Sequence, residues 1–225
     1  MVPVTDTAVL AWPVDLEARQ ALAEYVAGLP SDPSTISAAF DGTLRDLRGA
    51  DLSWLRLPAA YLFNANLAGV RLVRAYLGNA TLSGADLREA NLTAADLVKV
   101  EAVECQAAGA VFRGANLLGA DFTRADLRET DLRDALLNSV RFNACDLRTA
   151  DLRGAWLRSC WFGHEDNPAL LSDARLGGCR VEEATGVLTG PVDVGETAPQ
   201  WIDGAELAAW FAAHGAPAVR VVGAS

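Results

Sequence analysis

The sequence predicts an all-β solenoid, a shaft of short extended pieces joined by tight corners. A large apolar residue recurs at every fifth position from Leu47 to Phe162, and 22 of these 24 positions hold Leu or Phe. Two residues before each of them lies a smaller residue, which is Ala in 15 of the 24 units. Residues two apart in an extended chain point to the same side, so each unit turns one small and one large residue inward. Repeats this regular indicate a solenoid.

The outward positions indicate how many units close one coil. A step of fifteen residues gives a mixed set, whereas a step of twenty gives only acidic residues or amides, at Asp46, Asn66, Asp86, Gln106, Asp126 and Asp146. We therefore predict four units per coil and a four-sided prism of about six coils, roughly 29 Å long at ~4.8 Å per coil. Seven corners carry Gly directly before the next small residue, which suits a sharp bend.

The units resemble a known family. Ala-Asp-Leu-Arg-Glu at 85–89, Ala-Asn-Leu-Thr-Ala at 90–94, Ala-Asp-Phe-Thr-Arg at 120–124 and Ala-Asp-Leu-Arg-Gly at 150–154 look like pentapeptide repeats. The resemblance covers about half of the chain and implies a right-handed quadrilateral parallel β-helix. Some members resemble a DNA duplex in width and charge, bind DNA gyrase and protect it from quinolones or natural toxins. Many others have no known role.

The distribution of charge bears on that function. The net charge is −10, but residues 45–162 carry 15 basic and 14 acidic side chains. The acidity lies in residues 1–44 and 163–225, which contribute −5 and −6. A DNA mimic needs negative charge along the shaft, because duplex DNA carries one charge per ~1.7 Å. The near-neutral repeats depart from that pattern, and the overall acidity argues against direct binding of nucleic acid.

The chain divides into three parts: an N-terminal helical cap (1–44), the repeat β-helix (45–186) and a linker with a C-terminal helix (187–225). Residues 1–12 are expected to be irregular or one edge strand. Asp15 is the predicted N-cap of a helix that ends at Gly28 and Pro30, with an apolar face of Leu22, Tyr25, Val26 and Leu29. A short second helix is expected after residues 31–33, with Ile36 and Phe40 as its apolar residues.

The C-terminal part begins with a predicted Gly/Pro-rich linker, Gly186–Gln200. A helix follows from Asp203, and Gly215 and Pro217 end it. Its apolar stripe is Leu207, Trp210 and Phe211. This stripe either folds back on the outward-facing Trp156 and Trp161 or pairs with a second subunit, since relatives often dimerise through their C-terminal ends.

Two irregularities interrupt the repeats. Ala102 and Ala107 replace the large residue, which predicts a bend, a bulge or a compensating loop, unless the core is refilled by Val100, Val103 and Val111. After Phe162 four extra residues delay the next large residue to Leu171, so residues 163–168 are expected to form a loop that projects from a corner. His164, Glu165 and Asp166 lie in this loop, but adjacent residues rarely converge on one metal ion.

Two sets of side chains are candidates for contacts. In the first coils Trp54, Tyr61, Phe63 and Tyr76 face outward, either as a partner-binding patch or, as we favour, as the seat of the N-terminal helices. The candidate partner-binding residues are Asp86, Asp126, Asp131, Asp146, Asp151, His164, Glu165 and Asp166. The carboxylates alternate with Arg residues two positions on, so their other interpretation is a set of solubilising salt-bridge ladders.

No enzyme site is evident in the sequence. It contains no Ser-His-Asp set, paired-Cys motif, phosphate-cradling Gly loop or metal-ligand spacing, and the inward positions leave no pocket. We therefore expect no catalysis, cofactor or metal. No stretch has the length of a membrane span or the pattern of a signal peptide. The four Cys residues occupy small inward positions, which suits a reducing cytoplasm.

The sequence thus predicts a protein that acts through its surface. One hypothesis is DNA mimicry that protects gyrase, with Asp86, Asp126 and Asp146 competing with DNA for the enzyme. The alternative is a rigid scaffold or adaptor for an unknown protein partner.

Overall fold

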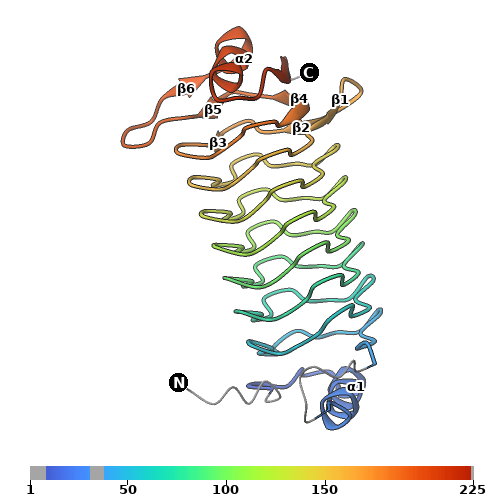
Figure 1. Ribbon diagram of the computed structural model, residues 1–225. Helices are drawn as coiled ribbons and strands as arrows, with labels where there is room; N and C mark the ends of the chain where they lie inside the picture. Colours follow the sequence, from blue (N-terminus) through green and yellow to red (C-terminus); the bar gives the residue numbers. More distant parts are fainter. Residues whose placement is uncertain (1–8, 31–37, 224–225) are drawn as a thin grey trace.

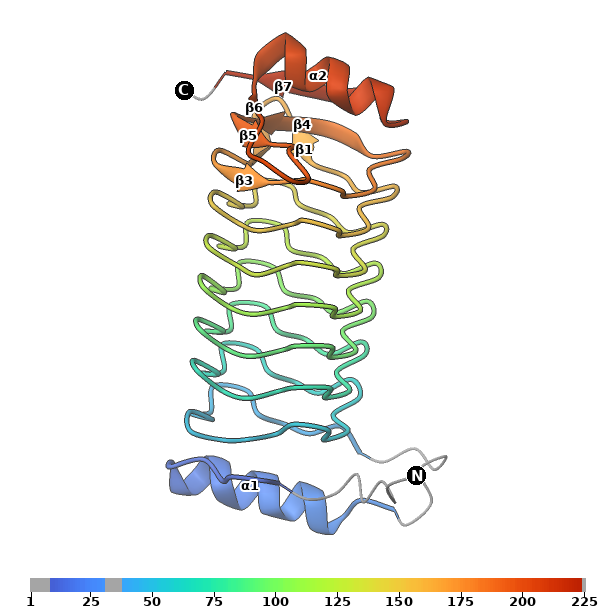
Figure 2. The same ribbon diagram turned by 90° about the vertical axis from the view of Figure 1, so that its left-hand side faces the viewer.

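The shaft predicted from the repeats is closed by a helix at each end. The computed structural model describes residues 9–30 and 38–223. Helix α1 (Leu16–Ala27) lies across the N-terminal end, and helix α2 (Gly204–Ala213) lies across the C-terminal end (Figures 1 and 2). Between them the chain winds in stacked coils of nearly constant outline, so that each coil contacts only its neighbours.

The register confirms four units per coil. Parallel bridges join residues twenty apart, as in Asp46 with Asn66 and Asp126 with Asp146. The coil starts at Asp41 and is still paired at Thr185, so the shaft is longer than the six coils predicted. We number the four faces in chain order by their outward residues: face 1 from Asp41 to Trp161, face 2 from Asp46 to Asp146, face 3 from Asp51 to Arg175 and face 4 from Arg56 to Arg180.

The corners explain why Asp and Asn recur at the outward positions. The carboxylate Oδ1 of Asp126 accepts a hydrogen bond from the backbone N–H of Arg128 at 3.2 Å, and the same bond recurs at corner after corner, with Asn91 as one amide version. A short side chain stabilises a tight turn when it accepts a hydrogen bond from the backbone N–H two residues later. The second corner residue has positive φ, as at Gly49 (80°), which is why glycine recurs there.

The core is a continuous apolar column. Phe122, Phe142 and Phe162 stack along face 1, with ring centroids 6.3 and 5.9 Å apart. The coil stays regular at Ala102 and Ala107, which are fully buried and keep their inter-coil hydrogen bonds. None of the predicted disruptions therefore occurs there.

Large residues lie in the core next to these two alanines. The rings of Phe112 and Phe122 meet edge to face at 6.1 Å beside this coil, and Val100 is buried as predicted. Val103 and Val111 do not refill the core, because both occupy outward or corner positions and remain partly exposed.

Helix α1 begins and ends as predicted. Asp15 is its N-cap, with Oδ1 accepting from the N–H of Ala18 at 2.8 Å, and Gly28 is the C-cap. Its buried residues are Ala18 and Leu22, and the Tyr25 hydroxyl donates to the Arg56 carbonyl at 2.7 Å. Ahead of the helix, Ala11 forms an antiparallel bridge to Asp51. The predicted second helix falls mostly on residues 31–37, outside the described residues. Residues 38–40, which include the buried Phe40, are described and are not helical.

The C-terminal part differs from the prediction. Four strands of one sheet lie in the order β1 (Gly163–His164), β2 (Asn167–Leu170), β4 (Thr185–Thr189) and β7 (Ala218–Val222), and three of a second sheet are β3 (Ala174–Arg175), β5 (Val192–Asp193) and β6 (Trp201–Ile202). The predicted linker Gly186–Gln200 is wrong: much of it continues the solenoid, because Val187, Leu188 and Val192 are buried in the core.

Strand β7 was not predicted at all. It pairs in parallel with β4 over five residues, from Ala218 to Val222, and adds the last rung of the sheet. The predicted loop 163–168 is a tight hairpin of β1 and β2, in which Gly163 faces Pro168 and His164 faces Asn167.

Helix α2 closes this end of the shaft. Its N-cap is Asp203, as predicted, and its apolar residues Leu207 and Phe211 are fully buried. The Phe211 ring packs against Phe162 at 6.0 Å, so the helix extends the phenylalanine column of the core. The stripe therefore folds back on its own shaft, but onto Phe162 rather than onto Trp156 and Trp161.

The cysteine side chains lie in the filled core of the shaft. Burial raises the pKa of the Cys105 and Cys160 thiols to about 12, and all four cysteines are buried and unpaired. Among residues 9–30 and 38–223 no group of three or more His, Cys, Asp or Glu is placed to hold a metal ion. In the same residues no helix is both long and apolar enough to cross a membrane.

Candidate protein-binding surfaces

The candidate carboxylates on faces 2 and 3 are each held by an arginine. In Asp126 the two carboxylate oxygens bind Nε and Nη2 of Arg128 at 2.8 and 2.7 Å. The same two-point ion pair, called a fork below, joins each of the other four candidates to the Arg two residues later in the chain: Asp86 to Arg88, Asp131 to Arg133, Asp146 to Arg148 and Asp151 to Arg153. These Asp side chains are 19–30% exposed. Their negative charge is therefore offset within the same corner.

Neighbouring coils connect these forks into ladders. Arg128 lies 3.8 Å from the Asp146 carboxylate of the next coil, and Arg133 lies 3.8 Å from that of Asp151. The Arg128 side chain, opposed by partial burial and helped by its own backbone N–H, lowers the pKa of Asp126. Stacked like charges are thereby compensated along the shaft.

The hairpin at 163–168 is attached at two points. His164 packs edge-on against Trp161, with ring centroids 4.9 Å apart. Glu165 accepts a hydrogen bond from Arg220 of β7 at 2.5 Å, which joins the hairpin to the last strand. Asp166 is exposed at the turn. Because His164 and Glu165 contact different neighbours and Asp166 is exposed, the three side chains form no common site.

The exposed aromatic residues of the first coils are not the seat of helix α1. Trp54, Tyr61 and Phe63 remain 48, 55 and 47% exposed, and Tyr76 is 36% exposed. The helix covers the open end of the prism instead, where Leu22 meets the core and Tyr25 packs on Phe40 at 5.4 Å. These four aromatic residues lie on the sides of the shaft, whereas helix α1 lies across its end.

The C-terminal tryptophans have local partners as well. Trp156 is 37% exposed and carries Arg180 over its ring at 4.1 Å. Trp210 of α2 stacks on His214 at 4.2 Å and meets Phe211 edge-on. A dimer built on the apolar stripe of α2 is not available in this arrangement, because Leu207 and Phe211 are already buried.

Face 4 and the corner before it carry a feature that sequence reasoning missed. Three arginines lie over aromatic rings of an adjacent coil: Arg56 over Tyr76 at 5.4 Å, Arg74 over Trp54 at 4.7 Å and Arg180 over Trp156 at 4.1 Å. Within the described residues none of the three is in an ion pair. The step of twenty could have shown the first two pairs, but the hairpin makes the third a step of 24.

The shaft separates its charges by side. We define the basic side as face 4 with the corners before and after it; it holds eight basic and four acidic residues (Arg56, Arg74, Lys99, Arg113, Arg133, Arg153, Arg158 and Arg180; Asp96, Asp134, Glu182 and Glu183).

Faces 1 and 2 with the corners that follow them form the acidic side. It holds thirteen acidic and six basic residues (Asp41, Asp46, Asp86, Glu89, Glu101, Glu104, Asp121, Asp126, Glu129, Asp146, Glu165, Asp166 and Asp173; Arg48, Arg88, Arg124, Arg128, Arg141 and Arg148). All six of these arginines are in ion pairs, whereas Glu89, Glu101 and Glu129 are in no ion pair within the described part of the chain. Glu89 and Glu129 act on Arg88 and Arg128 only from beyond ion-pair distance. The near-zero total charge of the shaft conceals this separation.

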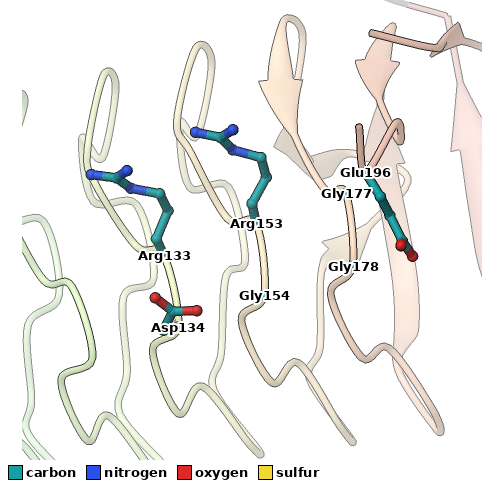
Figure 3. A pocket seen from close by; sticks show the side chains of 7 residues that line it. All are labelled: Arg133, Asp134, Arg153, Gly154, Gly177, Gly178 and Glu196. Atoms are coloured by element: carbon teal, nitrogen blue, oxygen red, sulfur yellow. The ribbon is translucent and has the colours of Figure 1, made fainter. Parts of the chain in front are cut away.

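A shallow hollow lies on the basic side, at the corner between faces 3 and 4 (Figure 3). Arg133 and Arg153 extend in the same direction from successive coils, Asp134 lies beside Arg133, and Glu196 lies on the opposite side of the hollow. Its floor is open because Gly154, Gly177 and Gly178 lack side chains. Both arginines are already bound to Asp131 and Asp151, and no nucleophile lines the hollow. This is a surface feature without the elements of an active site.

The coil register, the filled core and the corners held by Asp or Asn side chains define a four-sided parallel β-helix. Residues 60–162 match the family model "Pentapeptide repeats" in four overlapping segments, 60–98, 90–128, 103–138 and 125–162, with eight copies. The chain is a pentapeptide-repeat protein, and the family implies the right-handed form of the helix. No curated protein sequence matches the chain.

Several solved structures are similar to this one. HetL, a pentapeptide repeat protein involved in heterocyst differentiation regulation from the cyanobacterium Nostoc sp. strain PCC 7120, is 28% identical over 70% of this chain and 81% of its own, with a TM-score of 0.43. Rfr23 from the cyanobacterium Cyanothece 51142 is 28% identical over 44% of this chain and 82% of its own (TM-score 0.44). QnrB1, a plasmid-mediated fluoroquinolone resistance protein, is 16% identical over 82% and 92% (TM-score 0.44). Likenesses this distant carry no argument about function.

Proposed function

We propose that this chain is a non-catalytic binding protein, a rigid scaffold that contacts protein partners through the sides of its shaft. The observation that carries this proposal is the separation of unpaired charge, with Glu89, Glu101 and Glu129 on the acidic side and Arg56, Arg74 and Arg180 on the basic side. Salt-bridge ladders alone would not leave several like charges unpaired on each side, because such ladders neutralise charges locally. One carboxylate of the basic side, Asp96, also lies outside the ion pairs of the described residues and accepts a hydrogen bond from the Val98 N–H.

The core supports a role at the surface. The inward positions are packed with Ala, Leu and Phe and leave no room for a substrate. Each coil is tied to the next by backbone hydrogen bonds near 2.9 Å, as from Leu97 to Asn116 and from Asp126 to Cys105. A filled, cross-bonded shaft presents its outward side chains at fixed spacing, which suits a scaffold.

The test is affinity capture with the tagged full chain from extracts of cells that naturally contain it, followed by two charge-reversal variants. One changes the acidic side (Glu89→Lys with Glu129→Lys), and the other changes the basic side (Arg74→Glu with Arg180→Glu). We expect a captured protein that is lost with one variant and retained with the other. Capture that is insensitive to both variants would refute the proposal, as would the absence of any captured protein.

The second candidate function is protection of DNA gyrase by DNA mimicry, which the family resemblance suggests. The specific observation in its favour is the excess of carboxylates on the acidic side. Asp86, Asp126 and Asp146 are weak candidates for this contact, because the charge of each is offset by its own arginine. If gyrase binds here, Glu89, Glu101 and Glu129 are the residues whose charge remains available.

Supercoiling by purified bacterial gyrase tests this candidate. The protein is titrated from 0.1 to ~50 µM with and without a quinolone, alongside Glu89→Gln with Glu129→Gln. Inhibition of supercoiling or relief of drug-stabilised cleavage by the wild type, weakened in the variant, would support mimicry. No effect at the highest concentration would exclude that enzyme as the partner and leave the general scaffold proposal intact.

A further inference from the structure

We propose that the basic side of the shaft is a docking surface for an acidic segment of a partner protein that also carries apolar side chains. This inference rests on the proposed scaffold function and specifies the chemistry of one partner.

The first argument concerns the three arginines of the basic side that stack on aromatic rings. Arg74 and Arg180 lie 4.7 and 4.1 Å from the centres of the Trp54 and Trp156 rings, and Arg56 lies 5.4 Å from that of Tyr76. Stacking holds the plane of a guanidinium while its N–H groups at the edge remain free for a carboxylate. Each stacked arginine is therefore orientated yet without an acidic partner among the described residues.

The second argument concerns the exposed apolar side chains that lie among these arginines. Leu118, Leu136 and Trp156 are 43, 38 and 37% exposed, and Leu136 and Trp156 are bridged neighbours on face 4. Tyr76 and Trp54 continue the apolar exposure toward the first coils. By contrast, faces 2 and 3 present no exposed large hydrophobic side chain at their outward positions within the described chain. An apolar strip bordered by unpaired cations suits an amphipathic acidic ligand.

The third step distinguishes a protein segment from a nucleic acid. Arg56 and Arg180 are six coils apart, or ~29 Å at ~4.8 Å per coil. Duplex DNA of that length carries about 17 charges. Among the described residues the basic side offers four unpaired cations, Arg56, Arg74, Lys99 and Arg180, against one unpaired carboxylate, Asp96, while the whole protein carries a net charge of −10. An extended peptide of about nine residues spans the same length and can match both the few cations and the leucines.

The experiment measures binding of a fluorescein-labelled dodecapeptide of alternating Glu and Leu to the full chain by fluorescence anisotropy. The comparison probes are a Lys/Leu peptide of the same length and a single-stranded oligonucleotide of the same net charge. Arg74→Glu with Arg180→Glu removes two stacked arginines. The matched control, Arg88→Glu with Arg148→Glu, reverses the same number of charges on the acidic side. Far-UV circular dichroism and thermal melting establish that both variants are folded.

We expect the Glu/Leu peptide to bind the wild type with a Kd below 100 µM, the first variant at least tenfold more weakly, and the control within threefold of the wild type. Three results would overturn the inference: no binding at 1 mM, equal weakening by both variants, or tighter binding of the oligonucleotide than of the peptide. If the peptide fails while a captured protein still depends on Arg74 and Arg180, the scaffold function stands and only the acidic-segment inference falls.

Discussion

Replacing Phe142 by alanine is the sharpest test of the core. Phe142 is fully buried and stacks between Phe122 and Phe162 at 6.3 and 5.9 Å. Truncating a buried Phe to Ala typically costs about 3–5 kcal/mol, because transfer energy is lost and a cavity remains. Two stacked ring pairs are lost at once, and regular hydrogen-bonded coils on both sides resist collapse into the cavity. We therefore expect a cost near the upper end, about 4–5 kcal/mol.

The assay is urea unfolding followed by circular dichroism, with backbone hydrogen exchange as a local readout. Phe142→Leu is the matched control, because Leu occupies most large inward positions, including Leu137 and Leu147 of the adjoining units. It should cost no more than about 1.5 kcal/mol, since volume is largely conserved. Exchange in the alanine variant should accelerate most in the coils between 121 and 162, because each coil contacts only its neighbours. A loss below about 1.5 kcal/mol for alanine, or uniform acceleration along the shaft, would contradict this account of the core.

Three further predictions concern the corners. Asp126→Ala should lower the free energy of unfolding by about 1 kcal/mol in urea titrations, whereas Asp126→Asn, which keeps the acceptor for the Arg128 N–H, should cost less; equal losses would disprove the turn role. Thr149→Gly should raise the melting temperature and Gly114→Thr should lower it, because both positions have φ near 60°, where a β-branched residue is strained; changes of the opposite sign would refute this explanation. Since Asp126 and similar corner carboxylates have a folded pKa below their ordinary 3.8, their stabilising effect is complete above that value and is lost as the pH falls through the lower folded value. The urea midpoint should thus be nearly constant from pH 7 to 5 and decline below about pH 4, and a decline that starts near pH 6 would point to other groups.

The candidate sites were less predictable than the fold. The sequence indicated that Asp and Arg alternate at Asp126 and Arg128, and the structure shows the fork between them. It also indicated outward aromatics, but assigned Trp54 and Tyr76 to the wrong contact. Which residues of the shaft contact a terminal helix depends on where that helix lies across the end of the shaft. That crossing is determined by the packing of Leu22 and Tyr25 against the open end, and no local pattern encodes it.

The amino-acid sequence by itself determined the repeat, the four-unit coil, the inward series and both helix N-caps at Asp15 and Asp203. These features are local: a small and a large residue two apart, an Asx acceptor and a corner residue with positive φ repeat in every unit. Only the tertiary structure decided the continuation of the coil through the expected linker, strand β7 and the stacking of Arg180 on Trp156. Each of these depends on pairing between segments about twenty residues or more apart, shifted by the hairpin at 163–168, and such pairing is determined by coil register rather than by local preference.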